Sequence, residues 1–139
     1  MRFTRTDLIG NWRARREIED RRAGTRAYFT GVAVFAPTEA GCTYRETGRL
    51  HLPDGSAMEA RRCYLWRFHP DGRVEILFED GRPFHVLDPS DPGRLLVHPC
   101  GQDCYEGRYT VEGPHAWVTT WRVTGPAKDL VLRTRFTLR

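Results

Sequence analysis

The sequence predicts an all-β protein, a single antiparallel up-and-down β-barrel of about 8–10 strands with a short N-terminal helical turn. Apolar and polar residues alternate with the two-residue period of a strand along most of the 139 residues. Turns rich in Gly, Pro and Asp separate these runs, and no helical run long enough for a crossover connects them. Closing such a sheet removes its edges and leaves room for one small ligand.

The N-terminal elements come first. The only helical candidate covers residues 6–9, where Thr6 or Asp7 would cap the turn. Gly10-Asn11-Trp12 follows it directly and opens the first strand. Residues 27–36 carry strand-forming side chains on both faces, so this strand is expected to be covered on both sides for part of its length, and Pro37 ends it.

The next two strands each place one charged residue on an otherwise apolar face. In residues 42–51 the face that carries Cys42 and Tyr44 also carries Glu46. A hairpin turn at residues 53–56 leads to a strand at 60–68, whose aromatic face includes Arg62. The remaining strands are expected at residues 73–79, 84–87, 95–98, 103–111, 116–124 and 130–138.

Length and composition exclude several classes of protein. A chain of 139 residues is expected to form one domain, spanning residues 1–139. No run approaches the roughly 20 apolar residues of a membrane span. The first residues lack the apolar core of a signal peptide, so a cytoplasmic location with reduced thiols is expected for Cys42, Cys63, Cys100 and Cys104.

The basic residues are almost all arginines, and Lys128 is the only lysine among the 22 basic residues. The net charge is +4, but the basic residues are interleaved with 18 acidic ones. Proteins that grip phosphate backbones usually cluster their basic residues more strongly. No nucleic-acid partner and no membrane partner are therefore expected.

Gly10-Asn11-Trp12 resembles the Gly-x-Trp signature of the calycin superfamily, which includes lipocalins, fatty-acid-binding proteins and nitrobindin-like haem proteins. The resemblance implies that Gly10 and Trp12 lie at the closed floor of the barrel. It also implies that an arginine of the last strand, Arg133 or Arg135, packs across the tryptophan.

Further motifs resemble those of a family of small uncharacterised bacterial domains, a domain of unknown function with a calycin/lipocalin-like barrel. These motifs are Gly41-x-x-Tyr44-x-Glu46-x-Gly48, Tyr64-x-Trp66-Arg67, Asp80-Gly81-Arg82-Pro83-Phe84-His85, His98-x-Cys100-x-x-Asp103-x-Tyr105 and Gly125-Pro126-x-Lys128-Asp129. The resemblance covers nearly the whole chain and implies a fold but no activity.

The strongest candidates for a site are the charged residues on interior faces. A buried charge without a partner costs several kcal/mol, so Glu46 and Arg62 are expected to pair or to share a network. As a structural element, the pair would specify the fold. As a functional element, Arg62 would bind a carboxylate or phosphate, and Tyr64 and Trp66 would supply stacking surface for the ligand.

Two loop segments supply further candidates. The segment 80–85 holds Asp80, Arg82 and His85, either as a plain turn or with His85 at the barrel mouth as a titratable group. In the segment 98–105, His98 is either a structural histidine or a proton relay oriented by Asp103 or Glu46. The spacing there matches no zinc site, and no metal or other cofactor is expected.

The sequence thus predicts a β-barrel that binds a compact acidic or aromatic small molecule through Arg62 and aromatic walls. The ligand-binding candidates are Tyr44, Glu46, Arg62, Tyr64, Trp66, Asp80, Arg82, His85, His98, Tyr105 and Trp121. One alternative is a small isomerase, cyclase or hydrolase with Glu46, His85, His98 and Asp103 as acid–base groups. Another is a haem-binding, nitrobindin-like barrel that uses His85 or His98. Whether the protein is an enzyme, and whether it forms a homodimer, stay open at this point.

Overall fold

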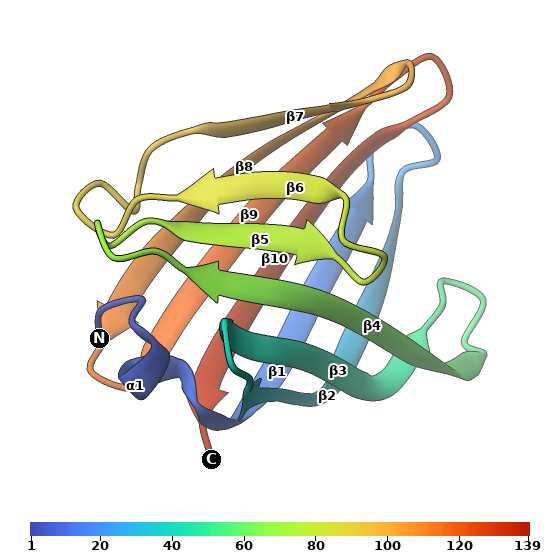
Figure 1. Cartoon of the computed structure of the whole chain (residues 1–139). Coiled ribbons are helices and arrows are strands. Elements are labelled where there is room, and N and C mark those ends of the chain that lie inside the picture. Colours follow the sequence, from blue (N-terminus) through green and yellow to red (C-terminus); the bar gives the residue numbers. More distant parts are fainter.

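Ten antiparallel strands form one sheet in the computed structural model, which describes residues 1–139 (Figure 1). The strands are β1 (Gly10–Asp20), β2 (Thr25–Pro37), β3 (Gly41–His51), β4 (Ala57–Phe68), β5 (Val74–Phe78), β6 (Pro83–Leu87), β7 (Leu96–Cys100), β8 (Asp103–Gly113), β9 (Ala116–Thr124) and β10 (Asp129–Leu138). Strands that follow one another in the chain are hydrogen-bonded neighbours, except β6 and β7. The predicted up-and-down barrel is confirmed.

Pairing of the first and last strands joins the two halves of the chain into one sheet that forms a nearly closed barrel. Strand β1 pairs with β10 from Trp12 opposite Leu138 to Asp20 opposite Leu130. The sheet order runs from β6 through β1 and β10 to β7, so a seam without strand hydrogen bonds separates β6 from β7. The unpaired edges of the sheet therefore belong to two short strands in the middle of the chain.

A four-residue helix, α1 (Arg5–Leu8), covers one end of the barrel (Figure 1). Its N-cap is Thr4, whose hydroxyl accepts a hydrogen bond from the Asp7 backbone N–H. The cap therefore lies two or three residues before the expected Thr6 or Asp7, and the helix starts one residue before the expected residue 6. The indole N–H of Trp12 donates to the carbonyl of Leu8 at 2.8 Å, which fastens the helix to the barrel floor. The chain has no helix with the length and apolar character required to span a membrane.

The arginine expected to lie across Trp12 is absent from the floor. Arg133 and Arg135 lie on the outer face of β10, where both contact the carboxylate of Glu112. Because side chains alternate along a strand, the residues that point inward are Thr134 and Phe136. The floor is closed by aromatic rings in edge-to-face and stacked contacts instead. The Trp12 and Trp117 rings lie 6.0 Å apart, and Phe136 stacks on Trp117 at 3.9 Å.

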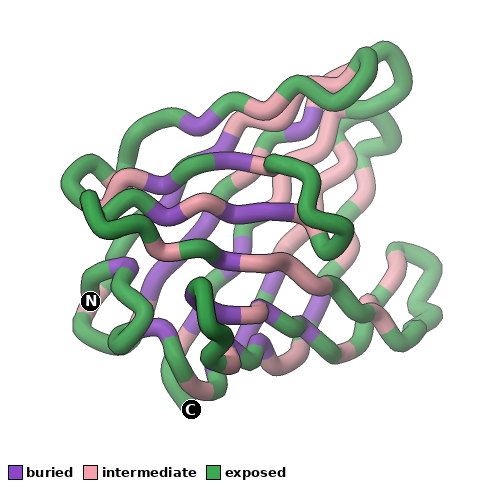
Figure 2. Tube along the Cα trace, viewed as in Figure 1, coloured by how far each residue is buried: buried purple, intermediate pink, exposed green.

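Burial is concentrated around this floor and along the inner faces of the strands, whereas the hairpins at the opposite end are half-buried or exposed (Figure 2). The largest fully buried side chains include Trp12, Trp117, Phe3, Phe35 and Leu8. The barrel therefore has a packed aromatic end beside α1 and a looser end at the β1–β2 and β9–β10 hairpins.

Strands β2 and β3 approach closely where Gly31 faces Gly48. A Cβ atom on Gly48 would lie 2.2 Å from the Thr30 carbonyl oxygen and 2.6 Å from the Gly31 Cα. The ring of Phe29 also lies over this crossing, with its Cζ 2.8 Å from the same position. Only glycine fits there.

The substitution Gly48→Ala is accordingly expected to destabilise the protein by about 1–3 kcal/mol, because the added methyl group meets backbone that cannot move aside. The matched control is Gly93→Ala, where the added methyl meets no atom within 4 Å. Chemical denaturation of the two variants measures the difference. Equal stability of both variants would contradict the close approach of β2 and β3.

Candidate functional site

A cavity of about 330 Å³ lies inside the barrel. Of the 20 residues that line it, 14 are hydrophobic, and none is acidic. The buried Trp66 and Trp117 belong to its deep end, while the exposed Arg62 and Lys128 belong to its outer end. The cavity thus runs from the aromatic floor toward the open end of the barrel.

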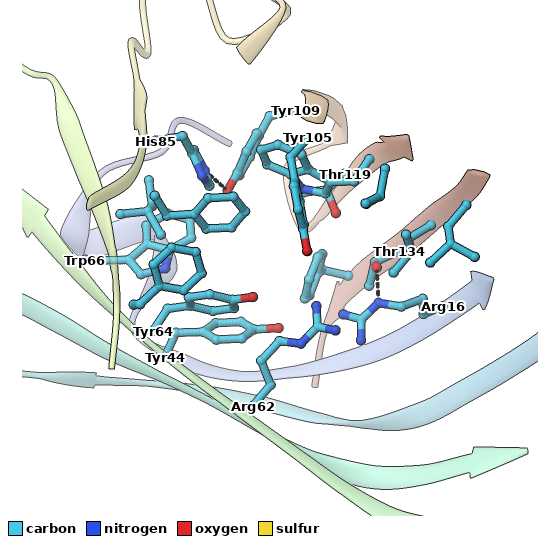
Figure 3. Close-up of a pocket in the computed structure, with 18 of the residues that line it drawn as sticks. Arg16, Tyr44, Arg62, Tyr64, Trp66, His85, Tyr105, Tyr109, Thr119 and Thr134 are labelled. Carbon is cyan, nitrogen blue, oxygen red and sulfur yellow. Dashed lines mark hydrogen bonds between the residues drawn. The ribbon is translucent and has the colours of Figure 1, made fainter. Parts of the chain in front are cut away.

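Polar groups gather on one side of this cavity. Figure 3 shows the guanidinium groups of Arg16 and Arg62 next to each other, with the hydroxyl groups of Tyr44, Tyr64 and Tyr105 directed toward the same space. These side chains come from β1, β4, β3 and β8, so the barrel wall brings together residues that are distant in sequence. Two cations and several hydroxyl groups facing one cavity form an arrangement suited to an anion.

Arg16 and Glu46 form a buried bidentate ion pair. The Arg16 Nη1 and Nη2 donate to Glu46 Oε2 and Oε1 at 2.8 and 2.6 Å, and the Arg16 Nε donates to Thr134 Oγ1 at 2.7 Å. The Tyr44 hydroxyl donates to Glu46 Oε1 at 2.5 Å. Arg16 is 7% exposed and Glu46 is 2% exposed, so almost no water reaches either charge.

The protonation states follow from this pairing. Burial alone would raise the pKa of Glu46, but the hydrogen bonds and positive charge of Arg16 outweigh it and hold that pKa below its usual value. Burial alone would lower the pKa of Arg16, but its hydrogen bonds to Glu46 and the charge of that carboxylate raise it instead. Both groups are therefore charged at neutral pH, and each neutralises the other.

Small residues on β2 allow Arg16 to reach Glu46. Strand β2 lies between β1 and β3 in the sheet; its inward residue Phe29 is opposite Arg16 and Ala33 is opposite Glu46, with Gly31 between them. With almost no side chain at Gly31 and Ala33, the guanidinium extends over β2 and lies 5.2 Å from the centre of the Phe29 ring. The local sequence of β2 thus makes room for the ion pair.

The direct pairing of Glu46 with Arg62 is not formed, but the two residues share a network. Burial would raise the pKa of Glu46, and the charge of Arg62 acts with the hydrogen bonds and charge of Arg16 to lower it. The two residues are opposite each other on β3 and β4, but the carboxylate is bound by Arg16. Arg62 makes no hydrogen bond or ion pair with any other residue, and its exposed side chain lines the cavity. Its guanidinium is therefore unpaired where it faces the cavity.

Arg16 was not among the predicted site residues, because it lies in the basic run Arg13-Ala14-Arg15-Arg16, which is typical of an exposed surface. The useful signal was the alternation of Trp12, Ala14 and Arg16, which places all three on the inner face of β1. That pattern marks Arg16 as buried and its neighbour Arg15 as exposed.

His85 is also buried against the cavity. Its Nε2 shares a 2.8 Å hydrogen bond with the Tyr109 hydroxyl, while its Nδ1 has no partner (Figure 3). Burial, with a smaller contribution from the charge of His98, lowers the pKa of His85 from 6.5 to about 3. The imidazole is therefore neutral at pH 7.

A β-bulge directs two consecutive residues into the cavity. Ile76 of β5 faces His85 and Leu77 faces Pro83, so Phe84 is an extra residue without a partner on β5. Both Phe84 and His85 consequently line the cavity. The Phe84 ring stacks on Phe78 at 4.8 Å and on Trp121 at 5.0 Å, and Trp121 belongs to the far side of the seam.

Asp80 and Arg82 do not line this cavity, but they line an open hollow beside it together with Arg62 and Tyr64. They bind each other in an exposed turn, where the Arg82 backbone N–H and Nε donate to the Asp80 carboxylate at 3.0 and 2.7 Å. The backbone hydrogen bond is the largest cause of the lowered pKa of Asp80. This segment is mainly a turn, and only its last two residues, Phe84 and His85, line the cavity.

The proposed relay between His98 and Asp103 is not formed. The Asp103 carboxylate contacts the Lys128 ammonium at 3.2 Å, and the His98 ring packs edge-on against Phe84 at 5.2 Å. Neither His98 nor Asp103 lines the cavity. Glu46 lies behind Arg16 and does not line it either. The other predicted ligand-binding residues, Tyr44, Arg62, Tyr64, Trp66, His85, Tyr105 and Trp121, all line the cavity.

Comparison with known proteins places this barrel in a family. The S-type phycobiliprotein lyase CPES from Guillardia theta superposes with a TM-score of 0.53 at 11% identity, over 96% of this chain and 88% of the lyase. A de novo designed fluorescence-activating β-barrel gives a TM-score of 0.47 at 16% identity, over 96% and 95% of the two chains. The first likeness concerns the fold and agrees with the predicted lipocalin-like barrel. No curated protein matches the sequence significantly. Residues 8–138 match the family of unknown function DUF6314, and the chain belongs to that family.

Proposed function

We propose that the protein binds a compact small molecule with an anionic group and an aromatic or apolar body inside the barrel. The observation that carries this proposal is the free guanidinium of Arg62 in a cavity whose walls are otherwise mainly aromatic. A volume of about 330 Å³ lies at the lower end of the range for small-molecule sites, which suits a compact ligand. Arginine offers a planar fork that matches a carboxylate or phosphate group.

The geometry supports binding over the two alternatives. Acid–base catalysis by Glu46, His98 and Asp103 lacks support because the two carboxylates are held in ion pairs and none of the three residues lines the cavity. The fourth acid–base candidate, His85, does line the cavity, but its Nε2 is held by Tyr109, and burial lowers its pKa to about 3. Haem ligation by His85 would require the loss of its hydrogen bond to Tyr109, since its other ring nitrogen is enclosed by protein. The other candidate ligand, His98, does not line the cavity.

The substitution Arg62→Met tests the proposal. With the fluorescent aromatic anion 8-anilinonaphthalene-1-sulfonate as the probe, the variant is expected to bind roughly 10- to 100-fold more weakly, because a charge-assisted hydrogen bond is lost. The melting temperature is expected to change by no more than about 2 °C, since Arg62 is exposed and has no partner. Fluorescence titration and thermal unfolding measure the two effects.

The matched control is Arg61→Met, which removes the neighbouring arginine from the outer face of the same strand. This variant is expected to bind the probe like the unmodified protein. If the Arg62 and Arg61 variants bind equally well, or if the wild-type protein does not bind the probe at all, the proposed cavity site is wrong. A large loss of stability in the Arg62 variant would instead assign this residue a structural role.

A further inference from the structure

The charges around the cavity leave one uncompensated cation. Three cationic side chains line it, Arg16, Arg62 and Lys128. Arg16 is neutralised by Glu46 at 2.6 Å, and Lys128 contacts Asp103 at 3.2 Å. Arg62 has no carboxylate within 4.0 Å, and His85 is neutral at pH 7. The cavity therefore offers a single net positive charge.

Two further donors lie close to this charge. The hydroxyl groups of Tyr64 and Tyr105 make no hydrogen bond with any other residue, whereas the Tyr44 hydroxyl is held by Glu46. Figure 3 shows both free hydroxyl groups directed toward the space in front of Arg62. Burial is the main cause that raises the pKa of Tyr64, so its hydroxyl stays protonated at neutral pH and can donate.

The polar and apolar groups are separated along the cavity. Arg62 and Lys128 are exposed at the open end, whereas Trp66, Ile76 and Trp117 are 3% exposed or less at the floor. A ligand that fits both ends must carry its charge near the mouth and its apolar part near the floor.

We infer that the ligand is a singly charged amphipathic anion, such as an aromatic carboxylate, bound with its charged group outward at Arg62 and its ring inward against Trp66 and Trp117. This inference rests on the proposed function and adds the charge and the orientation of the ligand. The free energy required to remove an anion from water rises with the square of the charge of the anion. The energy of its attraction to a single cation rises only in direct proportion to that charge. One free guanidinium therefore matches a monoanion better than a dianion.

Three probes with the same ring and different charge test the inference. At pH 8, 2-naphthoate carries one negative charge, 2-naphthamide carries none, and 2-naphthyl phosphate carries about two. Calorimetric titration is expected to show that 2-naphthoate binds roughly 10- to 100-fold more tightly than the amide and about tenfold more tightly than the phosphate. The tighter binding of 2-naphthoate relative to 2-naphthamide is expected to disappear in the Arg62→Met variant and to persist in the Arg61→Met variant.

The orientation has its own measurement. In nuclear Overhauser spectra of the complex, protons on the naphthoate ring distal to the carboxylate are expected to contact the indole protons of Trp66 or Trp117. Contacts of those protons with Lys128 or Leu130 would overturn the outward orientation. Equal or tighter binding of the phosphate or the amide would overturn the inferred charge while the cavity site stands. If none of the three probes nor the anilinonaphthalene sulfonate binds, the proposed function itself fails.

Discussion

Replacement of Glu46 by glutamine is expected to lower the free energy of unfolding by about 3–5 kcal/mol. Glutamine keeps the size of the side chain but removes the negative charge that Arg16 contacts through two nitrogen atoms. Since Arg16 is 7% exposed, its charge would stay buried without a counterion. For a chain of this length the melting temperature is expected to fall by roughly 10–20 °C.

Two controls separate the buried pair from ordinary surface effects. In Glu112→Gln, which removes the exposed partner of Arg133 and Arg135, a loss below about 1 kcal/mol is expected. The double variant Arg16→Met/Glu46→Leu removes both charges and is expected to recover most or all of the stability lost in the single variant. A double variant as unstable as Glu46→Gln would show that the stranded charge is not the cause.

Acid is expected to destabilise the protein through His85 by about 1.4 kcal/mol per pH unit below pH 6.5. The pKa of His85 falls from 6.5 to about 3 on folding, because the ring is buried and lies near His98. Between these two values the unfolded chain binds the proton and the folded protein does not, so stability falls as the pH falls. Above pH 6.5 the His85 side chain is neutral in both the folded and the unfolded protein, so it no longer contributes to the pH dependence of stability.

The substitution His85→Gln removes this titration while the amide retains the capacity to hydrogen-bond to Tyr109. Between pH 7 and pH 4.5 the unmodified protein is expected to lose roughly 3 kcal/mol more stability than the variant. Urea denaturation at the two pH values measures this difference. His51→Gln, at an exposed position, is expected to leave the pH dependence unchanged. A variant with the same acid sensitivity as the unmodified protein would show that His85 is accessible to protons in the folded state.

Much of the fold could be predicted because it depends on local patterns. Alternation along β3 and β4 correctly placed Tyr44, Glu46, Tyr64 and Trp66 on inner faces, and the Gly- and Pro-rich turns separated the strands. Each of these features is set by residues within a few positions of one another, so they are readable without knowledge of the rest of the barrel.

The partners within the site could not be predicted in the same way. Glu46 binds Arg16, which lies two strands away in the sheet, and that contact depends on the absence of side-chain bulk at Gly31 between them. Phe84 enters the cavity only because a bulge adds one residue to β6. Such outcomes arise from closure of the barrel and from one shifted register, and neither leaves a periodic signal in the sequence.

The pairing of β1 with β10 also determines when the protein can finish folding during its synthesis. The hydrogen bond from Arg16 to Thr134 joins positions 118 residues apart, so the wall behind the ion pair is incomplete until the ribosome has released β10. Until then β1 has β2 on one side and an unpaired edge on the other. Long-range strand pairing is slow, and exposed strand edges associate with other chains. The nascent chain is therefore most vulnerable to aggregation through β1 in the interval between synthesis of β2 and synthesis of β10.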